Sequence, residues 1–387
     1  MMFERHFARR KLLAAGALAL LAGCAVVPKA PGPAPAPSPA PAPPSSQLPT
    51  DAQRHRIALL VPMTGANGAV GQSIANAANM ALLDTNAQNL RITTYDTASN
   101  AGAAASRAIN DGNRLILGPL LADDIPSVVA VARPANVPLI SFSNDESAAD
   151  RGVYVMGNLP TQSVRRTVRY ARDHGVTTFG ALVPKGDYGD RASQALIAEA
   201  RAAGGAVMAI ETYDRRAASI AAAARKLRAR DDVDAILIAE SGGLSARAAG
   251  QVKAAGAATP RLLGTELWSG EKDVAASPAL AGAWFSSVSD TRFGQFAKSY
   301  RTRFGAQPYR IATLGYDGVL LTLRVARDWK PGKEFPTKAL SSPDGFLGLD
   351  GAFRFTRTGA IERALEVREV GGGTVKVVSP AAAKFAP

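Results

Sequence analysis

The chain has 387 residues, of which 47% are hydrophobic and 20% are charged, a composition that excludes a wholly disordered protein. The length predicts about two domains. One cysteine excludes an intrachain disulfide, and three scattered histidines argue against a histidine-based metal site, so we expect no metal and no cofactor.

The first residues are typical of an export signal. Four basic side chains precede the apolar run 12–21, which is about half as long as a membrane span, and the tetrapeptide LAGC then ends at Cys24. This tetrapeptide resembles the lipobox of bacterial lipoproteins, which implies a signal peptide over 1–23 and lipidation of Cys24. Ala25, rather than Asp, implies sorting to the outer membrane by the same resemblance. The alternative is a plain secretory signal with a chance cysteine.

The net charge bears on the partners. Removing 1–23 takes away four basic residues and one acidic residue, which lowers the formal charge from +13 to +10. An exported protein meets no genomic DNA, so we expect no nucleic-acid partner. Anionic lipid headgroups or the acidic cell-wall polymer would account for the remaining charge.

Residues 24–53 form a linker. Over 28–49 proline alternates with alanine and serine, a pattern that favours extended polyproline II chain with a reach on the order of 60–70 Å. We interpret it as a stalk between the membrane and a folded part.

The folded part alternates strand and helix, which predicts parallel sheets covered by helices on both faces. The strands are expected at 56–61, 90–95, 114–117, 137–141, 178–183, 206–213, 234–239, 261–264 and 283–288. The helices are expected at 70–83, 101–110, 125–133, 163–174, 190–203, 220–229, 244–255, 293–304 and 311–328. The last runs, from 346 to 378, alternate apolar and polar residues and predict an antiparallel addition.

Several stretches carry a family resemblance. IALLVPMTGANGAVGQSIANAANMAL, YDTASN, AINDGNRLILGPLLADDIPSV and VPLISFSN are similar to the first lobe of type I periplasmic binding proteins, and GLDGAFRFTRTGAIERALEVREV is similar to their closing hairpin. The resemblance implies an α/β fold of two lobes, each a parallel sheet flanked by helices, with three inter-lobe crossovers. It implies an N-terminal lobe of 54–162 plus 288–345 and a C-terminal lobe of 163–287 plus 346–380.

The resemblance also implies a cleft for a small polar ligand at the carboxyl ends of the strands. The matching positions are Thr64, Gly65, Leu120, Ala122, Ser141, Ser143, Asp145, Tyr188, Glu240 and Glu266. Glu266 matches a carboxylate that pairs with a ligand ammonium, and Tyr188 matches an aromatic wall. Ala122 and Asp145, however, stand where hydroxyls would hold a ligand carboxylate, and Asp145 would repel it. A general α-amino-acid site is therefore weakened.

Two functions follow from the resemblance, and neither is enzymatic. YDTASN and GPLL resemble the penicillin-binding protein activator family, outer-membrane lipoproteins that stimulate a bifunctional penicillin-binding protein, a peptidoglycan synthase. The helical-repeat domain of the best-known activators is not evident between the linker and the α/β part. The alternative is a solute-binding lipoprotein that serves the permease of an ABC-type branched-chain amino-acid importer.

Catalytic motifs are weak. The glycine-rich loop 65–71 matches neither a dinucleotide-binding nor a Walker loop, and GxSxG and HExxH do not occur. Asp317 lies in an apolar helix, where we expect a solvated side chain.

Overall fold

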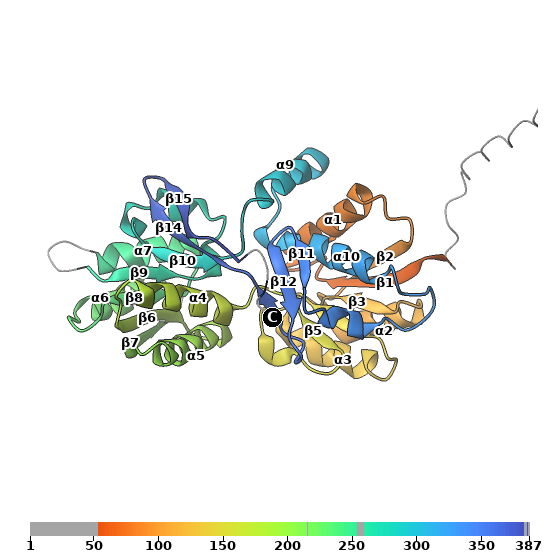
Figure 1. Cartoon of the computed structure of the whole chain (residues 1–387), viewed down its shortest axis with the longest axis horizontal. Coiled ribbons are helices and arrows are strands. Elements are labelled where there is room, and N and C mark those ends of the chain that lie inside the picture. The colour runs from red at the N-terminus through yellow and green to blue at the C-terminus, as the bar shows by residue number, and fades with distance from the viewer. Residues whose placement is uncertain (1–52, 215, 254–258, 383–384, 386–387) are drawn as a thin grey trace, which may run out of the picture. The chain divides into compact units, whose positions relative to one another are not determined.

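The computed structural model describes residues 53–214, 216–253, 259–382 and 385, and Figure 1 shows its elements. The expected signal peptide, Cys24 and linker therefore lie outside the described residues. None of the described helices is long and apolar enough to cross a membrane.

The N-terminal lobe holds a five-stranded parallel sheet. Its strands, in spatial order, are β2 (Leu90–Asp96), β1 (His55–Val61), β3 (Leu115–Leu117), β4 (Leu139–Ser141) and β5 (Val153–Val155). The lobe's helices are α1 (Gly68–Asp84), α2 (Ala101–Asn110), α3 (Ile125–Ala132), α9 (Phe293–Phe304) and α10 (Thr313–Val325). Short 3₁₀ turns cover Ala122–Asp124, Glu146–Ala148, Arg310–Ala312 and Thr337–Ser341.

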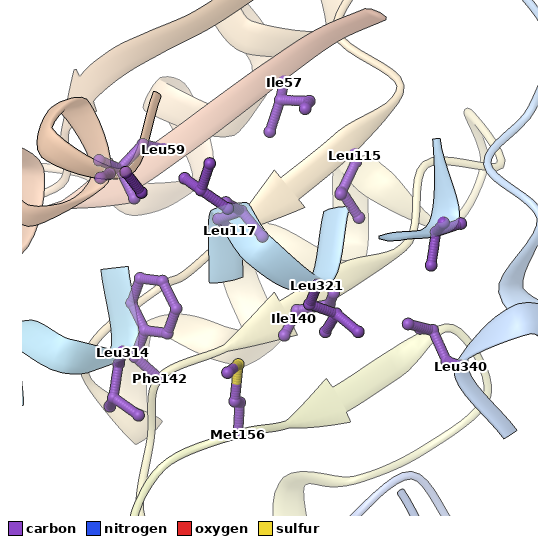
Figure 2. Close-up of a cluster of buried hydrophobic side chains, with 14 of the residues drawn as sticks. Ile57, Leu59, Leu115, Leu117, Ile140, Phe142, Met156, Leu314, Leu321 and Leu340 are labelled. Atoms are coloured by element: carbon purple, nitrogen blue, oxygen red, sulfur yellow. The ribbon is translucent and has the colours of Figure 1, made fainter. Parts of the chain in front are cut away.

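Alternation along β1 divides the core of this lobe between the two faces of the sheet. Ile57 and Leu59 pack on one face with side chains from α1 and α10, whereas Ala58 and Leu60 pack on the other face with α2 and α3. Figure 2 shows Ile57, Leu59, Leu117, Leu314 and Leu321 converging on the first face. Helices α1 and α10, far apart in sequence, lie side by side (Figure 1).

The C-terminal lobe holds a seven-stranded sheet. Its order is β7 (Ala206–Tyr213), β6 (Thr178–Pro184), β8 (Ala235–Ile238), β9 (Arg261–Gly264), β10 (Trp284–Ser287), β14 (Glu366–Gly371) and β15 (Thr374–Ser379). The helices are α4 (Pro160–Asp173), α5 (Asp187–Ala202), α6 (Ala217–Arg228), α7 (Gly242–Val252) and α8 (Lys272–Ala276), with 3₁₀ turns at Glu266–Trp268 and Pro278–Leu280. β14 pairs antiparallel with β10 and β15, as the alternating pattern predicts.

The first strand of each lobe leads into its next helix in the same way. In each, a buried strand runs into a proline, Pro62 or Pro184, and a glycine in the first turns of the next helix packs on that proline's carbonyl. A Cβ on Gly71 would lie 1.8 Å from the oxygen of Pro62, and a Cβ on Gly189 would lie 1.8 Å from the oxygen of Pro184. Only glycine allows this approach, which fixes each helix against the end of its strand.

The chain passes between the lobes three times, as expected: between β5 and α4, between β10 and α9, and between β13 (Ile361–Arg363) and β14. The third passage differs in position from the expected boundary at 346. β11 (Phe346–Gly348), β12 (Gly351–Phe355) and β13 form a separate antiparallel sheet. Its Phe353, Phe355 and Ile361 are buried in the core of the N-terminal lobe, so only β14 and β15 join the other sheet. Alternation predicts strands but does not say which core receives their apolar face.

Candidate functional site

Tyr188 and Glu266, two of the residues expected at the cleft, contact each other. Tyr188 lies in the first turn of α5, and Glu266 begins the 3₁₀ turn after β9. The Tyr188 hydroxyl donates to Glu266 Oε1 at 2.9 Å and lies 2.8 Å from Thr265 Oγ1. The structure thus brings together two of the residues that the sequence singled out, and it adds Thr265.

Burial perturbs the carboxyl of Glu266. Burial raises its pKa from 4.5 to about 7, and the hydrogen bond from Tyr188 opposes the shift. Oε2 is buried without a hydrogen-bond partner among the described residues. Burial and the neighbouring Glu266 charge raise the pKa of Tyr188 well above its usual range. Glu266 Oε2 is therefore an acceptor oxygen with no donor among the described residues.

The raised pKa predicts a loss of stability toward neutral pH. Because the folded state holds the Glu266 proton more tightly than the unfolded chain does, the free energy of unfolding should fall as pH rises from about 4.5 to about 7. We expect Glu266→Gln to remove part of this fall, since its amide keeps an acceptor for Tyr188 and does not ionise. Urea unfolding of both proteins across this range gives the difference. Parallel curves would contradict the assignment.

The carboxylate of Glu240 is hydrogen-bonded to other groups of the protein. Its side chain is buried, Oε2 accepts from the Tyr213 hydroxyl at 2.9 Å, and Oε1 accepts from the backbone N–H of Ser241 at 2.9 Å. The Trp268 indole donates to the Glu240 carbonyl at 3.1 Å. These contacts give Glu240 a structural role.

The hydroxyls of Ser141 and Ser143 form hydrogen bonds with the backbone. Ser141 Oγ donates to the carbonyl of Pro119 at 2.9 Å and accepts from the N–H of Ser143 at 3.1 Å. Ser143 Oγ accepts from the N–H of Asp145 at 3.1 Å. Both serines are buried, so these hydroxyls shape the loop after β4.

The remaining predicted residues lie apart from this cluster. Thr64 donates to a carboxylate oxygen of Asp96 at 2.7 Å, which closes the loop after β1, and Gly65 turns that loop with φ +71°. Leu120 packs against the core of the N-terminal lobe, and Ala122 begins a 3₁₀ turn. None of these four offers a charged group to the cleft.

Asp145 is paired across the cleft, which sequence reasoning missed. Arg191 of α5 places Nη1 3.2 Å from Asp145 Oδ2, and its Nη2 donates to Asn144 Oδ1 at 3.3 Å. The two charged side chains are 19% and 20% exposed, so the pair is largely shielded from water. A cavity of about 500 Å³ lies beside it, with Glu146 and Arg165 among its lining residues. The ion pair joins the lobes directly.

A second charged cluster lies where the chain crosses between the lobes. We call it the crossover cluster: Asp290, Arg310, Asp350, Glu366 and Arg368. Arg368 of β14 pairs with Asp290 and with Glu366, the latter at 2.7 Å. Arg310 connects Asp290, at 3.2 Å, to the fully buried Asp350, at 2.7 Å. The alternation Glu366-Val367-Arg368 was the available signal, because it places both charges on one face of a strand.

Asp317 corrects an expectation. It is fully buried rather than solvated, and its Oδ1 accepts from the N–H of Leu349 at 2.7 Å. Burial, reinforced by the charge of Asp350, raises its pKa to about 7. Asp317 thus fastens α10 to the turn between β11 and β12 and has no part in the cleft. Among the described residues, no group of three or more His, Cys, Asp or Glu side chains is arranged to hold a metal ion.

The two α/β lobes and the three connections between them define the class of fold. The model of the family "Periplasmic binding protein" matches residues 55–374, and the chain belongs to this family. Membership implies a periplasmic location.

Solved structures share the fold. The leucine-binding protein LivK of Thermotoga maritima is 19% identical with a TM-score of 0.64, over 84% of this chain and 98% of that one. The substrate-binding protein LivJ of Streptococcus pneumoniae, solved with isoleucine, is 19% identical with a TM-score of 0.64, over 84% and 100%. A solute-binding protein of Rhodopseudomonas palustris, solved with 3,4-dihydroxybenzoic acid, is 19% identical with a TM-score of 0.68, over 86% and 97%. At these identities the likeness concerns the fold alone.

Two curated proteins match part of the chain. An uncharacterized protein of Rickettsia prowazekii, RP748, is 29% identical over 142 residues, which are 36% of this chain and 38% of that protein. The penicillin-binding protein activator LpoA of Serratia proteamaculans is 28% identical over 153 residues, 36% of this chain and 22% of that protein. Apart from the uncharacterized protein, these named proteins are solute-binding or regulatory proteins rather than enzymes.

Proposed function

We propose that this chain is a non-enzymatic, lipid-anchored periplasmic protein that activates a bifunctional penicillin-binding protein, a peptidoglycan synthase. The observation that carries the proposal is the ion pair between Asp145 and Arg191, which joins the two lobes with side chains of the protein itself. A cleft bridged in this way serves as a docking scaffold without needing a solute to connect its lobes. The partial similarity to LpoA of Serratia proteamaculans supports the same function.

The anchor belongs to this proposal. Lipidation of Cys24 and the proline-rich linker would hold the folded part at the outer membrane and let it reach toward a synthase. Multiple acyl chains make such attachment stable.

Capture of the partner tests the function. The tagged full-length chain is crosslinked in its native cells, purified and analysed by mass spectrometry. We expect enrichment of a bifunctional peptidoglycan synthase. The purified pair should then polymerise glycan faster than the synthase alone. Enrichment of an ABC permease, with no synthase, would contradict the proposal.

We also predict that leucine, isoleucine and valine bind no more tightly than about millimolar. The hydroxyls of Ser141 and Ser143 hydrogen-bond to the backbone, and Asp145 already occupies Arg191, so a ligand carboxylate would have to break that shielded ion pair to reach a cation. Competition with this pair costs on the order of 100-fold in affinity. Isothermal titration of the purified chain measures it. A micromolar dissociation constant that Glu266→Ala abolishes would restore the importer function.

The receptor for an ABC importer stays the second candidate, because one observation favours it. Glu266 Oε2 is buried and has no hydrogen-bond partner among the described residues, an arrangement suited to a ligand ammonium. The ligand would be one whose anionic end, if any, pairs with Arg191 in place of Asp145. The same titration, repeated with amines that lack a carboxylate, separates this ligand class from amino acids.

A further inference from the structure

A small basic pocket lies at the amino ends of the strands of the N-terminal lobe. β1 begins at His55 and β3 at Leu115, so the pocket is at the edge of the sheet opposite the cleft, which follows the carboxyl ends. Its volume is about 220 Å³, and its lining includes Arg54, His55, Arg56, Gly112, Arg114 and Trp329. None of the described residues that line it is acidic.

His55 is built into the wall of this pocket. The side chain is 3% exposed, and its ring stacks on Trp329 with centroids 4.1 Å apart and an interplanar angle of 19°. Its Nδ1 is buried and has no hydrogen-bond partner among the described residues. A buried polar nitrogen left unpaired costs free energy, which a ligand that hydrogen-bonds to it would recover.

Arg54 also carries a buried nitrogen without a hydrogen-bond partner among the described residues. Its Nε is also buried without a partner in the described part of the chain, although it lines the same pocket. Arg54 and His55 thus each carry a buried nitrogen without a partner in the described part of the chain, and both residues line this pocket. Guanidinium groups in such a space select oxyanions, because they donate several hydrogen bonds in a fixed planar geometry.

The backbone supports the arrangement. Gly112 has φ +83°, and a Cβ there would lie 3.3 Å from Arg56 Nη1, so glycine leaves room for that guanidinium over the turn. Arg56 Nη1 donates to the carbonyl of Asp111 at 2.9 Å, which fixes its position. On the other side, the Trp329 indole donates to the carbonyl of Lys333 at 2.9 Å and fixes the stacking partner of His55.

We propose that this pocket binds a phosphate group, held by the guanidinium groups of Arg54 and Arg114 beside the His55 ring. The volume accommodates one such group with a small substituent. The group can come from free phosphate or from the headgroup of an anionic phospholipid, and the two sources share the same recognition chemistry. This site is independent of the function proposed above.

Histidine NMR tests the site on the full-length chain, labelled with ¹⁵N-histidine and kept in solution by a non-ionic detergent. Inorganic phosphate and glycerol phosphate are titrated separately. We expect a saturable shift of the His55 ring signals, while His174 on α4's C-terminal side serves as an internal control for the fold. Saturation by glycerol phosphate at lower concentration indicates the headgroup, and saturation by inorganic phosphate at lower concentration indicates the free ion.

The variants sharpen the test. Arg114→Gln, at an exposed position, should weaken phosphate about tenfold through the loss of a charge-assisted contact. Arg201→Gln, which removes an exposed charge from α5 in the other lobe, should leave the affinity unchanged. The site is refuted if neither anion moves His55, or if Arg114→Gln and Arg201→Gln bind phosphate equally well.

Discussion

Replacing Arg368 with methionine is expected to lower the free energy of unfolding by about 3–5 kcal/mol, the range for breaking a buried ion pair. The Arg368 side chain is 5% exposed and that of Glu366 is 8% exposed. Without the guanidinium, the Glu366 carboxylate would be a buried charge with no cation beside it. The Val288 carbonyl, which accepts from Arg368 Nη2 at 2.6 Å, would lose its donor as well.

Urea unfolding of Arg368→Met and of a matched control measures this effect. The control is Arg133→Met, which breaks the pair with Asp150, whose side chains are 51% and 64% exposed. Exposed pairs contribute less than about 1 kcal/mol, so the control should stay close to the parent protein. Equal losses of unfolding free energy in the two variants would show that the crossover cluster contributes no more to stability than an exposed ion pair does.

Gly71→Ala is expected to destabilise the N-terminal lobe by at least about 1–3 kcal/mol, the usual cost of overpacking. The new methyl group would lie 1.8 Å from the backbone oxygen of Pro62. Neither partner is a flexible side chain, so α1 has to move away from the end of β1. Gly189→Ala should act in the same way on α5 and β6.

Gly250→Ala in α7 provides the control for Gly71→Ala. Nothing lies within 4 Å of a Cβ at that position, and alanine favours a helix over glycine by about 0.5–1 kcal/mol. We therefore expect this variant to match or exceed the parent protein in thermal unfolding. A Gly71→Ala protein that unfolds at the same temperature as Gly250→Ala would contradict the packing argument.

Much of the fold is predictable from local patterns. The strand at His55–Val61 and the helix at Ala101–Asn110 follow from apolar runs bounded by Pro62 and by the cap residue Asn100, whose side chain accepts from the N–H of Ala103. These signals act within a few residues of the chain. The lobe against which β11, β12 and β13 pack depends on a core built from distant segments, and local alternation does not specify it.

The site was predictable only in part. The contact of Tyr188 with Glu266 follows from the rule that parallel strands end at one edge of a sheet. The pairing of Asp145 with Arg191 does not follow from any such rule, because their elements lie in different lobes. The burial of Asp317 does not follow from the sequence, because the turn whose N–H donates to its carboxylate is distant along the chain and close only in space.

The crossover cluster also bears on how the lobes can move. Asp290 and Arg368 belong to different passages between the lobes, and Arg363, near the third passage, donates to the carbonyl of Met156 in the first at 2.8 Å. A rotation about one passage therefore strains contacts held by the other two. We expect the lobes to switch cooperatively between discrete arrangements instead of flexing gradually, because shielded ion pairs are either formed or broken. A substitution at any one passage would then shift the populations of the whole molecule.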